Sequence, residues 1–253
     1  MRRYVLPGML LALVAGCSGR SGEADADDAK DVIKKAIKAQ GGEDKITRFR
    51  AGRWKGRGTL TPKGQDLPLT LETVYQLPDK YKTVMHFEVQ GKKIGVVQVL
   101  DGDKGWMSGQ GKILDLEGDL LKAFREEFYA VNVEMLVPLL REKGYRLSKL
   151  KETEVDGKPA VGVNVAAKDH KDIELYFDKE SFLPVKTVRP TLDVETMKEA
   201  TAEVLYSDIK EFDGIKWPSR MVFNQDGKRL MEVEITEFKR LDKLDPREFA
   251  RRK

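Results

Sequence analysis

The chain has 253 residues and an almost balanced charge, with 46 Lys and Arg against 42 Asp and Glu and a formal net charge of +4. Because charges of both signs are interspersed and make up 35% of the residues, they indicate a solvated surface and exclude the basic footprint of a nucleic-acid-binding protein. The only cysteine is Cys17, which excludes an internal disulfide framework.

The first residues are typical of a bacterial export signal. Arg2 and Arg3 form a short positive segment, and residues 4–16 carry no charge. This uncharged run is too short to span a hydrocarbon core, which takes about 20 residues as a helix, but it matches the apolar part of a signal peptide that ends in small residues. We therefore predict a signal peptide over residues 1–16, whose removal takes away Arg2 and Arg3 and lowers the net charge from +4 to +2.

Cys17 stands directly after this segment. The stretch LVAGC at 13–17 resembles the bacterial lipobox, in which an aliphatic residue and two small ones precede a cysteine. The resemblance implies that the chain is cut before Cys17 and that Cys17 carries acyl chains, two or three of which hold a protein stably on a membrane. The alternative is an ordinary signal peptide followed by an accidental cysteine.

Residues 17–25 contain several Gly and Ser residues and are predicted to form a flexible, lipidated tether. In lipoproteins of two-membrane bacteria, an Asp after the cysteine tends to retain the protein in the inner membrane. Because Ser18 occupies that place here, we expect anchoring in the outer membrane, facing the periplasm.

Residues 26–40 are predicted to form an amphipathic helix that ends at Gly41 and Gly42. Acidic residues lie near its start and lysines nearer its end, which matches the helix macrodipole. The apolar residues recur at helical spacing and form a stripe that needs a packing partner: Ala29, Val32, Ile33, Ala36 and Ile37.

After Gly42 the apolar residues recur with a period of two, which predicts antiparallel strands with one buried and one solvated face. The clearest runs are residues 80–89, 161–165, 173–177, 216–223 and 232–236. Asp-Gly pairs between strand-like runs favour type I′ hairpin turns; they lie at 101–102, 156–157, 213–214 and 226–227. Because no βαβ alternation is present, we predict an up-and-down meander of about ten strands and no parallel sheet.

One helical insert interrupts the strands, over residues 115–143. An apolar stripe runs along its first part, with Asp119 as a candidate cap: Leu120, Leu121, Phe124 and Phe128. A second short helix is expected to start near Asn132, and Pro138, which disfavours a helix interior, falls within it.

A twisted sheet of this size tends to curl, and its apolar face must be buried against other elements. The predicted helices are the elements at hand. We therefore expect a mainly β fold: a curved antiparallel sheet, forming an open half-barrel, with helices packed across the concave face. No second shift in composition marks a linker, so residues 26–253 are predicted to be a single domain.

Four stretches, in this order, resemble the outer-membrane lipoprotein-sorting family, the LolA/LolB-type periplasmic carriers. They are residues 35–60, the run IELYFDKESFLPVKT at 173–187, EFDGIKWPSRMVF at 211–223 and DPREF at 245–249. Members of that family form an open β half-barrel with a helical lid and bind acyl chains inside it. LolB-type members are lipoproteins and LolA-type members are soluble, so the resemblance implies a lipid-anchored carrier of lipid or lipoprotein acyl chains.

Little in the sequence points to catalysis. The two histidines, His86 and His170, are not at metal-ligand spacing, and no Gly-x-Ser-x-Gly elbow is present. Two glycine-rich runs at 56–61 and 109–114 lack the final glycine of a dinucleotide fingerprint. We therefore expect no enzyme activity, no metal and no cofactor.

The candidate site is instead apolar. Aromatic and Met side chains suit irregular hydrophobic ligands, and those predicted to line the concave face are Trp54, Tyr81, Met85, Phe87, Trp106, Phe124, Phe128, Trp217, Met221 and Phe223. Two hypotheses follow. The set either lines a cavity for acyl chains, or fills the core of a structural lipoprotein that binds an envelope protein partner by an exposed strand or by its outer face.

Overall fold

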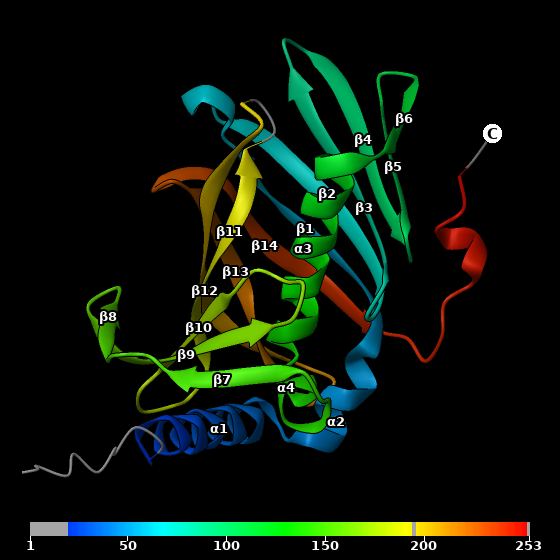
Figure 1. The fold of residues 1–253 in the computed structure, drawn as a ribbon. Coiled ribbons are helices and arrows are strands. Elements are labelled where there is room, and N and C mark those ends of the chain that lie inside the picture. Colours follow the sequence, from blue (N-terminus) through cyan, green and yellow to red (C-terminus); the bar gives the residue numbers. More distant parts are fainter. Residues whose placement is uncertain (1–19, 194–195, 252–253) are drawn as a thin grey trace, which may run out of the picture.

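The computed structural model describes residues 20–193 and 196–251. Fourteen strands form one antiparallel sheet within these residues. The first six form a meander of consecutive hairpins (Figure 1): β1 (Ala51–Leu60), β2 (Leu67–Gln76), β3 (Lys80–Val89), β4 (Lys92–Asp101), β5 (Lys104–Gly109) and β6 (Lys112–Leu116). The short 3-10 helix η2 (Pro62–Gly64) lies between β1 and β2.

A second meander follows the helical insert. It comprises β9 (Lys158–Ala167), β10 (Ile173–Asp178), β11 (Pro184–Asp193), β12 (Lys198–Phe212), β13 (Ile215–Gln225) and β14 (Lys228–Arg240). Two short strands, β7 (Tyr145–Lys149) and β8 (Thr153–Val155), pair with β9. The last strand, β14, pairs with β1, so the two meanders form one sheet with β6 and β7 at its ends.

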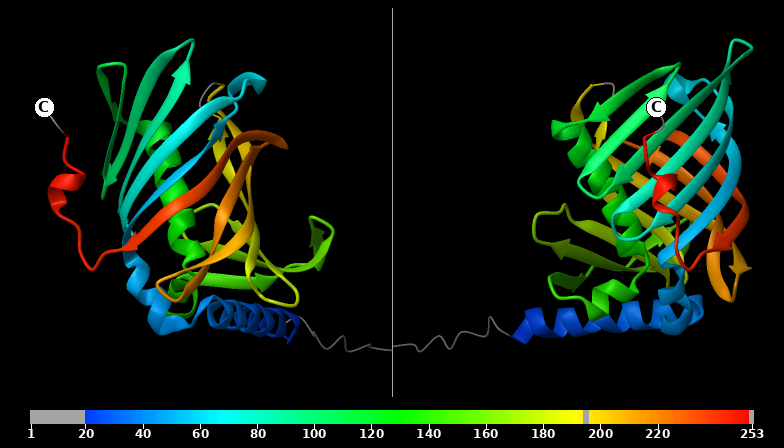
Figure 2. Two further views of the ribbon diagram at one scale, coloured as in Figure 1. Left: turned by 180° about the vertical axis from the view of Figure 1, so that it is seen from behind. Right: turned by 90° about the vertical axis from the view of Figure 1, so that its right-hand side faces the viewer.

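The sheet is strongly curved and its ends do not pair, as Figures 1 and 2 show. The predicted open, up-and-down antiparallel half-barrel is therefore confirmed. The sheet has more strands than the expected ten because Gln-Gly pairs at 90–91 and 110–111 also form tight turns, with positive φ at both residues.

Three of the four Asp-Gly pairs form the predicted turns with positive φ at both residues, at 156–157, 213–214 and 226–227. The fourth prediction is wrong. Asp101 is still the last residue of β4 and β5 starts at Lys104, so Gly102 and Asp103 make the turn, and of the two only Gly102 has positive φ.

Glycine is required where β1 meets β14. A Cβ at Gly58 would lie 1.8 Å from the carbonyl oxygen of Glu232, and one at Gly56 would lie 2.7 Å from a methyl group of Val233. A side chain at Gly58 would require the backbone to shift, and one at Gly56 would require the Val233 side chain to move. The Gly-x-Gly run at 56–58 is therefore explained by the close approach of these two strands.

The helix α1 (Arg20–Gln40) packs along one end of the sheet, against β7 and β9. Every residue of the predicted apolar stripe is buried: Ala29, Val32, Ile33, Ala36 and Ile37. The helix begins at Arg20, so it includes part of the segment that the sequence predicted to be a flexible tether. The signal peptide and Cys17 lie outside the described residues. The short helices α2 (Glu43–Thr47) and η1 (Arg48–Arg50) lead from α1 to β1.

The predicted helical insert is confirmed. Its long helix α3 (Gly118–Glu134) runs across the concave side between β5 and β11 (Figure 1). Asp119 does not cap this helix, because Glu117 holds the N-cap position. The helix continues through Asn132, and the chain turns at Leu136, where φ is +59°. The short α4 (Val137–Arg141) then starts with Pro138 in its first turn, where a missing N–H costs nothing.

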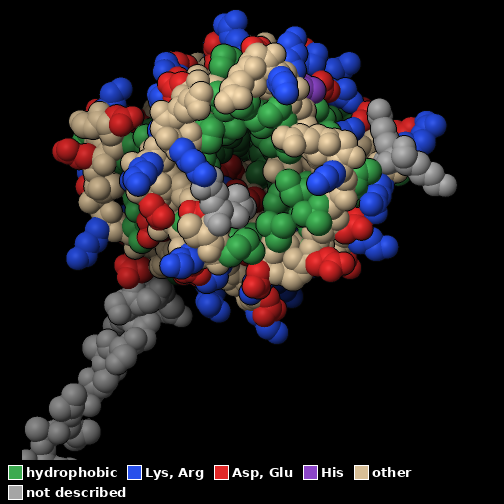
Figure 3. Space-filling model, turned by 90° about the horizontal axis from the view of Figure 1, so that it is seen from above, with side chains coloured by type: hydrophobic (Ala, Val, Ile, Leu, Met, Phe, Trp, Pro, Cys, Tyr) green, Lys and Arg blue, Asp and Glu red, His purple; other side chains and the backbone are tan. Residues whose placement is uncertain are grey.

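The largest apolar cluster lies between these helices and the concave side of β7, β9 and β10. A second cluster lies within the sheet on both sides of the β1–β14 pair and includes Leu69, Met221 and Val233. From the end opposite α1 the molecule is visibly hollowed, with hydrophobic side chains around the hollow and acidic ones inside it (Figure 3).

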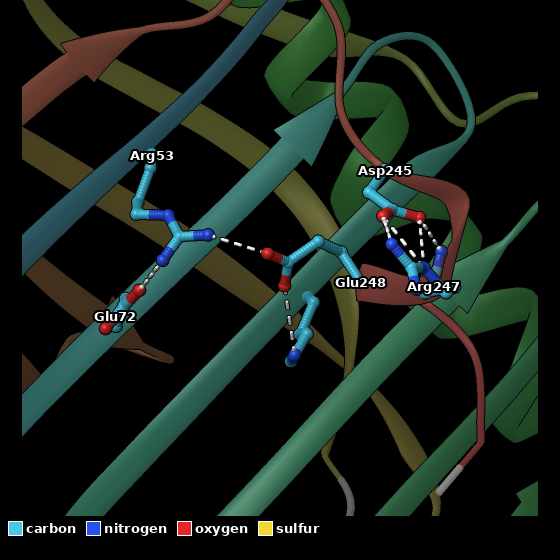
Figure 4. Close-up of polar contacts among 6 residues, drawn as sticks. Arg53, Glu72, Asp245, Arg247 and Glu248 are labelled. Carbon is cyan, nitrogen blue, oxygen red and sulfur yellow. Dashed lines mark hydrogen bonds and ion pairs between the residues drawn. The ribbon is translucent and has the colours of Figure 1, made fainter.

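The convex face carries the chain end. Residues 241–251, including the 3-10 helix η3 (Pro246–Glu248), follow β14 and lie against the outer side of the first meander. The carboxylate of Glu248 lies 2.9 Å from Arg53 and 3.5 Å from Lys82, and Arg53 also binds Glu72 at 2.8 Å (Figure 4). Phe249 is only 1% exposed and packs with Val74 and Val99.

We expect Phe249→Ala to lower the free energy of unfolding by about 3 kcal/mol, because it removes a fully buried aromatic ring. Urea denaturation measures this change. Arg247→Ala is the matched control, since that side chain is 89% exposed and pairs only with Asp245 in the same turn; it should alter stability by no more than about 0.5 kcal/mol. Equal stability of both variants would show that the chain end does not pack on the sheet.

Candidate ligand-binding cavity

A cavity of about 180 Å³ lies between α3 and the concave face of the sheet. Its walls come from the start of β1, the facing ends of β2 and β3, strands β11 to β14 and the second half of α3. Most of the lining is apolar: Ile46, Phe49, Trp54, Tyr75, Tyr81, Phe128, Ala130, Val131, Met135, Val204, Phe212, Ile215, Trp217, Met221, Phe223, Ile235 and Phe238. The hypothesis that the concave face is completely filled is not supported, because a cavity of this size exceeds the space of several waters.

A compact polar cluster interrupts the apolar wall. Arg189 on β11 forms an ion pair with Glu127 on α3, and the hydroxyl of Thr191 donates to the other oxygen of Glu127 at 2.8 Å. Tyr206 on β12 donates to Glu134 on α3 at 2.7 Å. These contacts fasten the helix to the sheet across the cavity.

Burial among apolar groups governs the protonation of this cluster. It raises the pKa of Glu134 above its ordinary value of 4.5, although Arg189 and the Tyr206 hydroxyl favour the charged carboxylate. Burial, followed by the field of Glu134, raises the pKa of Tyr206 well above its ordinary value. Tyr206 is therefore neutral at physiological pH and acts as a hydrogen-bond donor.

The structure brings six of the predicted site residues into the cavity wall: Trp54, Tyr81, Phe128, Trp217, Met221 and Phe223. Phe124 stands one turn before Phe128 on α3 and meets its ring edge-on, with ring centroids 6.2 Å apart, but it does not line the cavity. Met85 and Phe87 also lie beyond the cavity wall, packed against the cluster that includes Leu69 and Leu71.

Trp106 requires a correction. It is paired with Val99 and therefore lies on the same side of the sheet as Val99, against the chain end on the convex face. Its indole nitrogen donates to the carbonyl of Phe249 at 3.4 Å. The strand β5 is short and its residues GWMSG do not alternate, so aromatic character alone was not enough to choose the face.

The polar cluster was not predicted. Thr187, Arg189 and Thr191 occupy the inward positions of β11, where their polarity suggests a solvated face. One signal was available, since Glu127 and Glu134 are seven residues apart and share the side of α3 that carries Phe124. Acidic residues within an apolar helical stripe indicate a buried polar site.

The histidines lie elsewhere. His86 is exposed on the convex face. His170 stacks on Tyr129, with ring centroids 3.6 Å apart, and its Nδ1 lies 3.0 Å from Glu126. Among the residues that the structure describes, no group of three His, Cys, Asp or Glu side chains is arranged to hold a metal ion.

The fold is shared with solved structures, although no family model matches the sequence and no curated protein is significantly similar to it. A LolA superfamily protein from Nitrosomonas europaea superposes with a TM-score of 0.57 at 11% identity over 88% of this chain and 97% of that one. An outer-membrane lipoprotein-sorting protein domain from Vibrio parahaemolyticus gives a TM-score of 0.54 at 12% identity over the same shares. This chain has the LolA-like fold.

A protein of the DUF1329 family from Desulfovibrio piger has this LolA-like fold too, with a TM-score of 0.57 at 11% identity over 88% of this chain and 97% of that one. The resemblance read from the four sequence stretches is thus confirmed at the level of the fold. Within the described residues, no helix of this LolA-like domain is long and apolar enough to cross a membrane.

Glu134→Gln should change how stability depends on pH. A carboxyl group whose pKa is higher in the folded state binds more protons there, so its contribution to the free energy of unfolding falls as pH rises from about 4.5 through the folded pKa. The variant removes this fall while keeping an acceptor for Tyr206. Thermal unfolding across that range should show the variant gaining stability relative to the wild type as pH rises. Glu211→Gln at the exposed surface is the control. If stability depends on pH in the same way in all three proteins, the raised pKa of Glu134 is contradicted.

Proposed function

We propose that this protein is a non-catalytic, lipid-anchored protein of the cell envelope that binds the acyl chains of lipids or lipoproteins. The observation that carries the proposal is the apolar cavity between α3 and the concave sheet, with aromatic and Met side chains in its wall. Sites for small ligands are usually concave and mostly apolar, with a few polar groups, and this cavity has that composition.

The size of the cavity defines how a chain binds. Its 180 Å³ is below the roughly 300–1,000 Å³ typical of ligand pockets. One part of an acyl chain fits, and the remainder extends into the hollow that opens at the end opposite α1 (Figure 3). Outward movement of α3 enlarges the site. Since the chain exchanges one apolar environment for another, the net free energy is small and the transfer is reversible.

Lipidation of Cys17 complements this arrangement. The helix α1 begins three residues after Cys17 and lies at the end of the molecule opposite the hollow. An anchor at Cys17 therefore leaves the open end directed away from the anchor point, where it can meet acyl chains arriving from the periplasm. In this proposal the anchoring membrane is the outer membrane, because Ser18 stands where an Asp would favour retention in the inner membrane.

Val131→Trp should block the site. Val131 lies on α3 in the cavity wall, and an indole ring there occupies the space of the ligand. In a soluble form carrying Cys17→Ser, we expect a fluorescent fatty acid to bind the parent protein and to bind the Val131→Trp variant at least about 10-fold more weakly, which corresponds to ~1.4 kcal/mol. Native mass spectrometry should find co-purified lipid only on the parent.

The matched control for this test is Leu205→Trp. Leu205 is next to the cavity-lining Val204 on β12 and points to the other side of the sheet, so this variant should bind like the parent. Absence of lipid and of probe uptake in the parent protein itself would refute acyl-chain binding.

The anchor has a separate test. Cells that express the full chain and are fed an alkyne-labelled fatty acid should incorporate the label into the wild type and not into Cys17→Ser. The wild type should fractionate with outer membranes, and the variant should not. Equal labelling of both proteins would rule out Cys17 as the lipidated residue.

A further inference from the structure

Arg189 has hydrogen-bonding capacity that the protein does not use. Its side chain is 8% exposed, and Nη2 is engaged by Glu127. The other two nitrogens, Nε and Nη1, are buried and have no partner among the described residues. Among the described residues that line the cavity, only Arg189 has such unpartnered side-chain atoms. Since buried N–H groups in native proteins are nearly always paired with protein, water or ligand atoms, Nε and Nη1 are available to a ligand that enters the cavity.

The other polar groups of the cluster are already occupied. The Thr191 hydroxyl donates to Glu127, the Tyr206 hydroxyl donates to Glu134, and Thr187 lies 3.2 Å from the Tyr206 oxygen. The donors that remain for a ligand in this part of the wall therefore belong to Arg189. A ligand that uses them must present an acceptor oxygen in the middle of an otherwise apolar site.

The charge of the cluster selects the kind of acceptor. One guanidinium faces two carboxylates, Glu127 and Glu134, and the first already forms an ion pair with it. An ionised ligand group would meet two like charges and an arginine that is already neutralised, and it would lose its own hydration. A neutral carbonyl oxygen gains a hydrogen bond from one of these N–H groups without either cost.

We propose that one of the two unpartnered nitrogens of Arg189, Nε or Nη1, donates a hydrogen bond to the carbonyl oxygen of the ester or amide that joins an acyl chain to its headgroup. This inference rests on the proposed function and adds the ligand class: ester- or amide-linked chains bind in preference to ether-linked chains and to ionised free fatty acids. Because both nitrogens are covered in the structure, the carbonyl reaches one of them as α3 moves outward to admit the chain.

The test compares two neutral ligands that differ in the carbonyl alone, a 1-monoacylglycerol and the 1-O-alkylglycerol of the same chain length. Each displaces a fluorescent fatty acid from the soluble Cys17→Ser protein. A hydrogen bond to a charged donor predicts that the ester binds at least about 10-fold more tightly than the ether. In Arg189→Met we expect the two affinities to become equal, mainly through weaker ester binding. The free fatty acid, ionised at the assay pH, should bind the parent more weakly than the ester.

Two further variants control for misfolding and for effects of losing any arginine. Arg189→Met with Glu127→Gln removes both members of the ion pair, so Glu127 is not left as a buried charge without its partner; it should also bind ester and ether equally. Arg220→Met replaces an exposed arginine of β13 that pairs with Glu232, and it should keep the preference of the parent.

The outcomes separate the two proposals. If the parent binds ester and ether equally, or if the preference survives in both Arg189 variants, carbonyl recognition by Arg189 is refuted while acyl-chain binding stands. If the parent binds neither ligand nor the fluorescent probe, acyl-chain binding fails and the inference fails with it.

Discussion

The pairing of β1 with β14 is the contact on which the rest of the structure depends. It joins two separate meanders into one curved sheet and leaves β6 and β7 as the ends. The insert between those two strands in the chain, α3 and α4, must therefore connect the two ends, and its shortest course crosses the concave side. Gly56 and Gly58 allow the two backbones to approach closely at this pair.

The same arrangement creates a site that neither meander has alone. Trp54 comes from β1, Arg189 from β11 and Glu127 from the insert, yet all three line one cavity. Two ends of the molecule differ as a result: α1 and α4 cover one end of the concave side, and the other end stays hollow. In the function proposed above, an acyl chain enters from the hollow end.

Burying a polar cluster in an apolar cavity costs free energy. Charged groups removed from water need partners, and replacing such pairs by apolar residues is often neutral or stabilising. The cluster of Arg189, Glu127, Glu134 and Tyr206 is therefore poorly explained by stability alone. The cluster holds α3 against the sheet. In the inference proposed above, it also provides the Arg189 donors for a ligand, and the two roles are compatible.

The sequence by itself determined the elements and much of the architecture. Alternating residues such as Ile173, Leu175 and Phe177, the stripe along α1 and the Asp-Gly turns report local backbone geometry, and period and turn chemistry are local properties. They were sufficient for a curved antiparallel sheet with helices on its concave side. They also identified residues of the cavity wall, because the alternation along strands such as residues 216–223 and the stripe of the helical insert reveal which side chains share a face.

Only the tertiary structure decided which strands meet and what the concave side encloses. The β1–β14 pair joins residues about 180 positions apart, a contact with no local signature. Trp106 lies on the convex face because it pairs with Val99 on the neighbouring strand, and paired residues point to the same side of the sheet. Arg189 looked like an ordinary solvated strand residue, and it became a buried cavity residue because a helix from another part of the chain covers it. Cavities arise from the volume left between packed surfaces, and volume is not encoded in any single segment.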